Sequence, residues 1–591
     1  MKKDTITLKK IFKLIIENKK DLLWGQVFTF IAICISIPIP LMLPALVDEV
    51  LLNKPGFFVN NINHFFSSGN AFYYIAIVTV AVILLRVLYF LFSAITTKIF
   101  TKISKFVTFK IREKILLHLK QVNMNEYESM GSGAITSNLV TDVNTLDSFI
   151  INGASKFISS ILTLIGVSIV MISIHPILGF MILFIQPIII LLSKKISKSV
   201  GQLKKKENEA VENFQNNLGE TLDLFGQIKA SNKEKYFFNQ SIKNALNVKK
   251  TSDEFNFKSV AYERFSFTIF LVAFEVLRAS GLVMVAYSDL SIGMMFAMFG
   301  YIWFIMTPIQ DILSIQYSYA NASAALKRIN KIFHLKKENT GVIELPLEIK
   351  NIEIDIKNLY FSYIEDKPLL KDITLNIKPK DKVALIGASG SGKTTLAQII
   401  SGFYQKNSGQ ITYNDINIDE INKESLRKNI FLVLQMPILF NNTLRFNISM
   451  DNESINDEDI FEALKIAQLY ESIQDMPNGL DTIVGKHGVR LSGGQRQRLS
   501  IARMIVSKAN VVIFDESTSA LDVQTETKLF NSLQPILKDK TVITIAHRLS
   551  TVKNADKIFV LESGEIVQRG THDELEDVQG HYQDFIKNQL V

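Results

Sequence analysis

A glycine-rich stretch in the second half of the chain has the residue types that bind the phosphates of a nucleotide. It reads GASGSGKTT and begins at Gly387. Gly387, Gly390 and Gly392 let the backbone wrap closely, so that its N–H groups can face phosphate oxygens. Lys393 should reach the β- and γ-phosphates, and the hydroxyl of Thr394 should ligate Mg²⁺.

The residues around this loop support the same interpretation. A short apolar run, Val383 to Ile386, leads directly into the glycines, and a helical pattern, LAQIISGFY, follows them. A strand before the loop and a helix after it are the context that a phosphate-binding loop requires. The N-terminus of that helix adds partial positive charge beside the phosphates.

A second apolar run, Val511 to Phe514, ends in the acidic residues Asp515 and Glu516. In a nucleotide-binding sheet, a carboxylate at this position can meet Mg²⁺ directly or through water. The adjacent Glu516 can orient or polarise the attacking water. An ordinary strand that ends in a polar turn has the same pattern, so the acidic pair alone is a weak signal.

Between these two motifs lies LSGGQ, residues 491–495, followed by RQRLSIARMIV. A serine and two glycines that open a helix form another anion-binding N-terminus. A chain with one phosphate loop does not need a second such turn of its own, so this turn makes sense if it caps a nucleotide held by another copy. The alternative is an ordinary serine-capped helix start, and the pentapeptide alone favours neither.

The elements that must position these motifs fall into two parts of different composition. The chain has 591 residues, of which 48% are hydrophobic and 21% charged, and this excludes a disordered or fibrous protein. Long apolar runs crowd the first half, whereas a polar linker follows His334 and strand-like runs begin at Ile352. A membrane domain is therefore predicted to precede a soluble domain.

The net charge and the cysteine content exclude several kinds of binding site. The net charge of +8 is explained by Lys and Arg near the cytoplasmic ends of membrane spans, and no compact basic and aromatic patch indicates nucleic-acid binding. The single cysteine, Cys34, excludes a disulfide and a cysteine-based metal site within one chain.

Six stretches are apolar and long enough to cross a bilayer core of about 30 Å as helices. The first contains three prolines and should bend, and the third and fourth share one uncharged run with a turn at His175 and Pro176. The stretches are Leu22 to Leu52, Ala71 to Ile95, two within Phe157 to Ser193, Phe265 to Tyr287, and Ile292 to Pro308.

Lysine and arginine set the predicted orientation. The first 20 residues contain seven lysines, segments 98–120 and 194–206 are also basic, and alternation of the spans places all three on one side. Both termini and the soluble domain should therefore be cytoplasmic. The long cytoplasmic connectors, about 96–148 and 194–264, are predicted as helical hairpins whose tips dock on the soluble domain, rather than as solvated loops.

Charged residues inside the spans are candidates for a translocation cavity. Glu275 and Arg278 lie three residues apart in the fifth span and share a helical face, and Arg86 lies in the second span. One interpretation is a structural ion pair, either between Glu275 and Arg278 or with Arg86. The other is that this face meets a polar part of a transported substrate.

The second half resembles the nucleotide-binding domain of ABC transporters, over about Ile352 to Val591. The first half is similar to the six-helix membrane domain of ABC exporters that carry one such ATPase, and Tyr127-Glu128 and residues 136–143 resemble its first intracellular coupling region. The motifs stand in the family's order: GASGSGKT, Gln435 after a strand, LSGGQ, VVIFDE, the SALD turn from Ser519 to Asp522, and His547 in ITIAHRLS.

The resemblance implies an α-helical membrane domain over 1–335, with six transmembrane helices and long cytoplasmic extensions. A linker over 336–350 and an α/β P-loop ATPase domain over 351–591 follow. It also implies a two-fold assembly, most simply a homodimer, in which each of two ATP molecules touches the phosphate loop of one chain and the LSGGQ turn of the other.

The resemblance also assigns roles to single residues. Glu516 matches the catalytic carboxylate, His547 the residue that contacts the γ-phosphate, and Tyr363 the aromatic residue that stacks on adenine. Thr394, Gln435 and Asp515 are expected at Mg²⁺. The residues expected to bind ATP and Mg²⁺ are Tyr363, Gly387, Ser389, Gly390, Gly392, Lys393, Thr394, Thr395, Gln435, Ser492, Gly493, Gly494, Gln495, Asp515 and Asp522.

The sequence departs from the family pattern at two places. Ser517 stands where alanine usually follows the glutamate, which is a small change beside the site. Ile483 and Lys486 stand where such exporters often carry acidic residues, in a loop that usually touches the coupling helices. The charge pairing at that contact is therefore expected to differ, without effect on ATP hydrolysis.

Together these inferences predict an ATP-driven exporter in the bacterial inner membrane. It would hydrolyse ATP to move a lipid, an amphipathic small molecule or a peptide by alternating access. An ATP-gated regulator or channel-like sensor, and an importer built on the same architecture, stay open as alternatives.

Overall fold

The computed structural model describes residues 5–54, 56–65, 68–364, 366–485, 491–517, 520–546 and 548–590. Predicted site residues Ser519, Lys486 and His547 lie outside them. The chain divides into two compact units. Unit 1 consists of Met1–Leu116 and Ile135–His334, and unit 2 of Leu117–Ala134 and Leu335–Val591.

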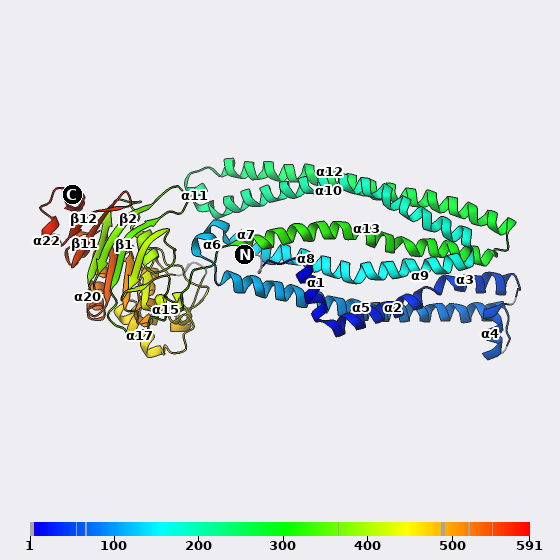
Figure 1. The fold of residues 1–591 in the computed structure, drawn as a ribbon, viewed down its shortest axis with the longest axis horizontal. Helices are drawn as coiled ribbons and strands as arrows, with labels where there is room; N and C mark the ends of the chain where they lie inside the picture. The colour runs from blue at the N-terminus through cyan, green and yellow to red at the C-terminus, as the bar shows by residue number, and fades with distance from the viewer. Residues whose placement is uncertain are drawn as a thin grey trace. The chain divides into compact units, whose positions relative to one another are not determined.

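Unit 1 is helical wherever the structure describes regular elements in it (Figure 1). The elements that belong to it wholly or in part are α1 (Leu8–Glu17), α2 (Lys19–Ser36), η1 (Ile39–Leu41), α3 (Met42–Pro44), η2 (Ala45–Leu51), α4 (Phe57–Phe65), α5 (Ala71–Leu119), α7 (Ser132–Ser137), η3 (Asn138–Asp142), α8 (Val143–Ile151), η4 (Asn152–Phe157), α9 (Ile158–Ile174), α10 (Pro176–Asp223), α11 (Phe225–Ala230), α12 (Glu234–Tyr287) and α13 (Ile292–His334).

Among the described residues, four helical stretches are long and apolar enough to cross a membrane: Lys19–Leu51, Ala71–Leu119, Glu234–Tyr287 and Ile292–Ile312. α9 is apolar but shorter, and the fourth predicted span falls within α10, which begins directly after His175. In the first stretch, three prolines interrupt the α-helix, because proline lacks an N–H donor. There the 3₁₀-helix η1, the single turn α3 and the π-helix η2 replace it.

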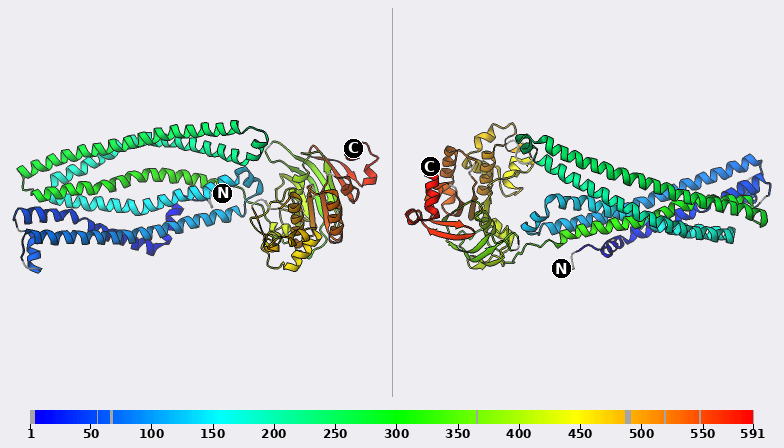
Figure 2. Two further views of the ribbon diagram at one scale, coloured as in Figure 1. Left: turned by 180° about the vertical axis from the view of Figure 1, so that it is seen from behind. Right: turned by 90° about the horizontal axis from the view of Figure 1, so that it is seen from above.

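Four helices extend far beyond the thickness of a bilayer. α5, α10, α12 and α13 contain 49, 48, 54 and 43 residues. At a rise of about 1.5 Å per residue, α12 is about 80 Å long, whereas a bilayer core is about 30 Å thick. α10 and α12 lie side by side, and α11 joins them at one end (Figures 1 and 2). This is the helical hairpin predicted for the second connector.

Two kinds of contact hold unit 1 together. Val167, Met171 and Tyr301 are buried between α9, α12 and α13. The Tyr301 hydroxyl also donates a hydrogen bond of 2.5 Å to the backbone oxygen of Ile37. Near the other end of α13, Arg328 pairs with the buried Asp142 of η3 at 2.5 Å. The helices are therefore joined by an apolar core and by a small number of polar ties.

Unit 2 is built on two main sheets. One is a four-stranded antiparallel sheet in the order β2-β1-β4-β5, and the other has six strands in the order β12-β11-β3-β10-β9-β6. The strands are β1 (Ile354–Phe361), β2 (Leu370–Ile377), β3 (Lys382–Gly387), β4 (Ser408–Tyr413), β5 (Ile416–Asn417), β6 (Ile430–Val433), β7 (Asn442–Thr443), β8 (Ile483–Val484), β9 (Val511–Asp515), β10 (Thr541–Ile545), β11 (Lys557–Glu562) and β12 (Glu565–Gly570).

The six-stranded sheet positions the site. Its strands β11, β3, β10, β9 and β6 are parallel to their neighbours, so that their carboxyl ends meet at one edge. β9 is buried along its whole length, as expected for a parallel strand with both faces covered. The helices of this unit are α6 (Met124–Met130), α14 (Lys393–Ile400), α15 (Lys423–Asn429), α16 (Leu444–Ser449), α17 (Asp457–Ile466), α18 (Tyr470–Gln474), η5 (Gly479–Asp481), α19 (Gly493–Ser507), α20 (Val523–Leu537), α21 (Leu549–Lys553), α22 (His572–Leu575) and α23 (His581–Leu590).

Unit 2 also contains the tip of the first cytoplasmic connector, residues 117–134. Its backbone pairs with the linker: the N–H of Asn123 donates to the oxygen of Lys336 at 3.0 Å, and the N–H of Glu338 donates to the oxygen of Gln121 at 2.7 Å. The tip thus packs with the α/β unit. The predicted domain boundaries at 335 and 351 stay a prediction.

Candidate nucleotide-binding site

The glycine-rich loop connects β3 to α14, as the sequence predicts. Gly387, Gly390 and Gly392 all have positive φ, at 147°, 83° and 101°. A Cβ on Gly387 would lie 2.0 Å from the backbone oxygen of Leu561, and one on Gly392 would lie 2.5 Å from Cδ2 of Leu370. The close-wrapped loop therefore depends on glycine for its backbone conformation and for space.

Lys393 is the first residue of α14 and is 6% exposed. Its Nζ donates hydrogen bonds of 2.9 Å to the backbone oxygens of Gly387 and Ala388. Burial lowers the pKa of Lys393, and the negative charges of Glu516 and Asp515 oppose this shift. The ammonium is thus held at the loop, where phosphate oxygens would compete well for its donors.

A buried hydroxyl in the loop also fits a phosphate. Ser391 is 4% exposed, and its Oγ has no hydrogen-bond partner among the described residues. A buried hydroxyl without a partner is unfavourable, and a phosphate oxygen would satisfy it. The sequence predicts ATP binding by Ser389, which is exposed, and Ser391 is not among the predicted residues. The position of Ser391 between two glycines was the available signal.

The predicted Mg²⁺ and water-orienting residues meet at the carboxyl edge of the sheet. Oγ1 of Thr394 donates to Oδ1 of Asp515 at 3.0 Å, and Nε2 of Gln435 donates to Oε2 of Glu516 at 2.6 Å. Asp515 ends β9, and Gln435 follows β6, the neighbouring strand. Mg²⁺ is commonly held by one or two carboxylates together with substrate phosphates, and this set of oxygens fits it.

An aromatic cluster lies beside the loop. Tyr363 follows β1, is 39% exposed, and its hydroxyl lies 3.0 Å from Oγ1 of Thr395 in α14. Phe361 and Tyr404 meet its ring edge to face, with centroids 4.9 and 5.2 Å away. Tyr363 is therefore near the phosphate loop with part of its surface accessible, as stacking on adenine requires.

The LSGGQ turn caps α19. Ser492 accepts from the N–H of Gln495 at 3.2 Å, and the Gln495 side chain accepts from the N–H of Ser492 at 2.8 Å. A Cβ on Gly494 would lie 2.9 Å from Cδ2 of Leu521, while Gly493 lies near Ala520. In the described part of one chain, the hydrogen bonds of Ser492 stay within the turn and the start of α19, and none reaches the phosphate loop.

Gln497 connects this turn to the carboxyl edge of the sheet. Its Nε2 donates to the backbone oxygen of Gln435 at 3.2 Å, and its Oε1 accepts from the N–H of Ala520 at 3.1 Å. The segments after β6 and β9 are therefore both bonded to the LSGGQ helix. Gln497 is not among the residues predicted from the sequence, although it lies two residues after the motif.

Asp522 and Ile483 can be placed from the structure. Asp522 caps α20 by accepting from the N–H of Thr525, and this bond lowers the pKa of Asp522. His547 comes directly after Ala546 in the sequence and lies outside the described residues. Ile483 is in β8 and is exposed.

The charged candidates of the spans form one pair. Nη2 of Arg278 lies 2.5 Å from Oε2 of Glu275, and both side chains are about half exposed. Both residues are in α12, so the pair lies within one helix. Arg86 is exposed in α5, and the described residues show no bond between it and the pair.

Comparison with known proteins identifies the family. Residues 24–309 match the family model "ABC transporter transmembrane region", and residues 370–519 match the family model "ABC transporter". An ATP-dependent lipid A-core flippase of Legionella pneumophila (strain Paris) is 30% identical over 518 residues, which are 84% of this chain and 85% of the relative. The chain belongs to the ABC transporter family.

Further similarities place this ABC transporter among exporters. A Staphylococcus aureus (strain NCTC 8325 / PS 47) protein, provisionally named as a multidrug export ATP-binding/permease protein, is 32% identical over 489 residues, 81% of this chain and 83% of the relative. A solved structure of a bacterial Atm1-family ABC exporter with ATP bound has the same fold: it is 20% identical, with a TM-score of 0.85 over 97% of this chain and 98% of that chain.

These findings confirm the predicted class of protein. The transporter is a membrane protein with an N-terminal transmembrane domain and a C-terminal ATPase domain. It binds ATP, and it is an ATP-driven exporter that couples hydrolysis to transport. One chain carries one domain of each kind, which is the half-transporter architecture and indicates dimerisation.

Proposed function

We propose that two copies of this transporter form a homodimer that exports an amphipathic molecule, such as a lipid, across the bacterial inner membrane. The observation that carries this proposal is the LSGGQ turn. It is an anion-directed helix start in a chain whose single phosphate loop already holds one nucleotide, and Gln497 bonds it to the catalytic edge. A second copy places the turn on the partner's nucleotide.

Each composite site would then divide its work among named side chains. Lys393 and the loop N–H groups bind the phosphates, while Thr394, Asp515 and Gln435 hold Mg²⁺, which neutralises charge on the phosphates. Glu516, held by Gln435, orients the attacking water. His547 is proposed to contact the γ-phosphate, as the family resemblance implies.

The conformational cycle follows from the difference between ATP and ADP. ATP between two ATPase domains contacts both chains through its phosphates, and the contacts to the LSGGQ turn weaken once the γ-phosphate is lost. A ligand shifts a conformational equilibrium only if it binds one state more tightly than the other. ATP favours the closed ATPase domains more than ADP does, because only ATP has the γ-phosphate. The long hairpins carry closure of the ATPase domains to the spans, which open alternately to the two sides.

The proposed orientation places the ATPase domain and both termini in the cytoplasm. The basic segments near the N-terminus and along the two long connectors support it, because Lys and Arg favour the cytoplasmic ends of spans. The names of the two relatives support an amphipathic substrate. One names a lipid A-core flippase and the other names multidrug export.

Transport into sealed vesicles tests this function. Inside-out vesicles should accumulate an amphipathic substrate only with ATP and Mg²⁺, and candidate lipids, amphipathic drugs and peptides can first be compared by the ATPase stimulation they cause in nanodiscs. ATP-dependent movement of the substrate in the opposite direction, out of these vesicles, would indicate an importer. Stimulated hydrolysis with no ATP-dependent accumulation would instead indicate a regulator or channel-like sensor.

A further inference from the structure

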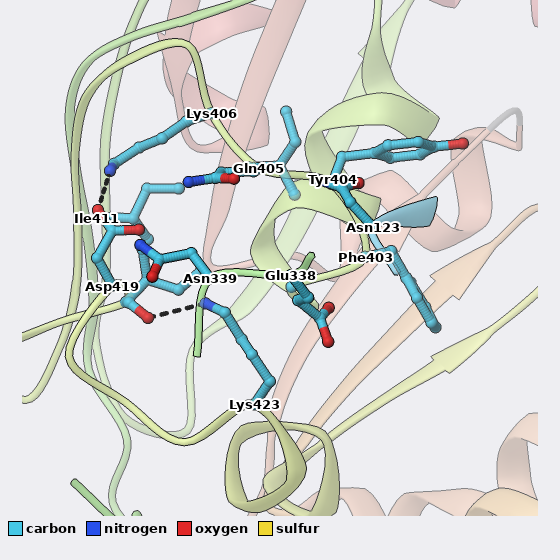
Figure 3. Close-up of a pocket in the computed structure, with 13 residues that line it drawn as sticks. Asn123, Glu338, Asn339, Phe403, Tyr404, Gln405, Lys406, Ile411, Asp419 and Lys423 are labelled. Carbon is cyan, nitrogen blue, oxygen red and sulfur yellow. Dashed lines mark hydrogen bonds and ion pairs between the residues drawn. The ribbon is translucent and has the colours of Figure 1, made fainter. Parts of the chain in front are cut away.

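One buried tyrosine connects the first connector's tip with the nucleotide site. Tyr404, which follows α14, is 6% exposed, and its hydroxyl donates a hydrogen bond of 2.7 Å to Oε2 of Glu128 in α6. Figure 3 shows Tyr404 and Asn123, the residue that caps α6, lining one pocket of unit 2. Because Asn123 is also bonded to the linker at Lys336, α6 is held at two points.

The ring of Tyr404 meets the residue predicted to stack on adenine. The ring centroids of Tyr404 and Tyr363 are 5.2 Å apart and their planes are perpendicular, at 89°. Such edge-to-face pairs attract each other and have a preferred geometry. The hydroxyl of Tyr363 is bonded to Thr395 of α14. Tyr363 is thus held between the phosphate-loop helix and Tyr404.

Burial raises the pKa of the Tyr404 hydroxyl, and its bond to Glu128 raises it further. The hydroxyl is therefore protonated across the physiological range and always available as the donor. Its acceptor is a carboxylate, and hydrogen bonds to charged acceptors are stronger than neutral ones. The bond joins two segments that lie 276 residues apart in the sequence.

We propose that Tyr404 is a positioning residue that holds the ring of Tyr363 for the adenine of ATP and makes that position depend on α6 through Glu128. The inference rests on the proposed function, because it needs Tyr363 to stack on adenine. Coupling between two sites is reciprocal in free energy. Movement of α6 therefore changes the affinity for ATP, and ATP changes how firmly α6 is held.

The first test separates KM from kcat in the full-length transporter in nanodiscs. Tyr404→Phe keeps the ring and removes the hydroxyl, whereas Glu128→Ala removes the acceptor. Each should raise the KM for ATP about 3- to 10-fold while kcat stays within about twofold. The double variant should raise KM no further than either single variant, because all three lose the same bond.

Matched variants distinguish this role from a structural one. Glu128→Gln retains an oxygen that accepts the hydroxyl, so it should keep most of the affinity for ATP. Tyr582→Phe removes another buried hydroxyl of unit 2, which lies 2.7 Å from His572, and should lower thermal stability without changing KM. An unchanged KM in both Tyr404→Phe and Glu128→Ala would overturn the proposal.

Inorganic triphosphate provides a probe without a base. Its inhibition constant should be the same in the wild-type protein and in Tyr404→Phe, because the variant acts on the adenine end of the site. An equal weakening of ATP and triphosphate binding would show that the variant disturbs the phosphate loop, and would also overturn the proposal.

Two further measurements complete the test. If Tyr363→Ala leaves the affinity for ATP unchanged, Tyr363 does not stack on adenine, and this inference fails as well. If Tyr363→Ala lowers the affinity for ATP but Tyr404→Phe does not, only this inference is refuted. In a Glu516→Gln background, ATP should slow amide hydrogen exchange in residues 124–130, and Tyr404→Phe should remove that effect. Equal slowing with and without the hydroxyl would contradict the link to α6.

Discussion

The charged residues of the nucleotide site and the charged pair of α12 are held in opposite ways. Lys393 and Asp515 are 6% and 3% exposed, and the polar contacts of the site join residues from different strands and helices. Glu275 and Arg278 instead pair with each other along one helix, and their side chains are 55% and 53% exposed. The ATPase unit completes most of its site within one chain, whereas this pair shows no second helix among the described residues that would complete it.

This difference shows which contacts a single chain forms by itself. At the nucleotide site, Lys393 and Asp515 are buried, so a polar contact that either residue makes is costly to lose, and replacing either one should have a large and specific effect. On α12, the pair is half exposed in the single chain, and exposed pairs contribute little to stability. Its role depends on what a second copy, lipid or substrate places against it.

The largest expected effect is at the nucleotide site. Glu516→Gln should keep ATP binding and reduce hydrolysis by roughly two to four orders of magnitude, because the amide cannot accept a proton or polarise water as the carboxylate does. The side chain bonded to Gln435 keeps its shape, so folding should not change. Steady-state phosphate release and ATP binding by equilibrium dialysis measure the two quantities.

Glu562→Gln is a matched control for this variant. Glu562 ends β11, a parallel strand of the same sheet that is separated from β9 by β3 and β10, so it tests a carboxylate at another strand end. Its hydrolysis rate should stay within about threefold of the wild-type rate. Near wild-type hydrolysis by Glu516→Gln would show that the catalytic assignment is wrong.

Mixed dimers test whether the second half of the site comes from another copy. Ser492→Arg and Lys393→Ala should each inactivate their homodimers. In a dimer with one chain of each kind, both lesions fall in one composite site and the other site is intact, so about half of the wild-type activity should remain if the sites act independently. ATPase assays on doubly tagged, purified mixed dimers measure this.

The outcome separates two arrangements. Activity clearly above both homodimers supports the head-to-tail arrangement, in which the LSGGQ turn of one chain serves the nucleotide of the other. Activity no greater than that of the homodimers would count against independent composite sites.

Local backbone requirements explain why so much of the site could be predicted. Gly387 and Gly392 lie where a Cβ would collide with Leu561 and Leu370, and such a requirement is visible in the sequence as glycine. The same holds for the bend of the first span, because prolines cannot donate to the helix. Hydrophobic patterning predicts that a membrane domain precedes a soluble domain, and the motifs and the family resemblance predict the α/β ATPase fold.

Contacts between distant segments could not be predicted in this way. Nothing near Tyr404 in the sequence indicates that it bonds Glu128, and nothing near Gln497 indicates bonds to Gln435 and Ala520. Ser391 was missed for another reason, because its importance lies in a hydroxyl left without a partner, which only burial reveals. Tertiary packing decides these properties.

A buried cation in unit 2 gives a smaller effect, on stability. Lys423, which lines the pocket of Figure 3, is 8% exposed, and its Nζ donates to the oxygen of Ile418 at 2.8 Å. Burial lowers its pKa to about 8 from the usual 10.5. Between these pH values the unfolded chain binds a proton that the folded chain has released. The free energy of unfolding should therefore rise with pH from about 8 to 10.5.

Lys423→Met should remove this rise and increase the free energy of unfolding at pH 7 by about 1–3 kcal/mol, allowing for the lost bond to Ile418. Thermal unfolding of the detergent-solubilised protein from pH 7 to pH 10 measures it. Lys538→Met, at an exposed lysine, should leave the pH dependence as it is. A wild-type melting temperature that does not rise relative to Lys423→Met above pH 8 would contradict the expectation.

The smallest effect on stability is expected at Glu275, and this variant tests whether the charged pair of α12 differs from the nucleotide site. A charge that faces lipid at the bilayer centre costs roughly 2.5–3.5 kcal/mol, so Arg278 should face polar surroundings. We expect Glu275→Gln to change stability by less than about 1 kcal/mol and basal ATPase activity by less than about twofold, because the pair is half exposed and joins no second described helix. If the pair lines the translocation cavity and meets the substrate, substrate-stimulated ATPase activity should change several-fold. Glu254→Gln breaks the Lys258 pair on the same helix, outside the predicted fifth span, and should change neither quantity. A joint fall of melting temperature, basal and stimulated activity in Glu275→Gln would show that the pair is structural after all, and that the assembled membrane domain buries it as firmly as the ATPase unit buries Lys393.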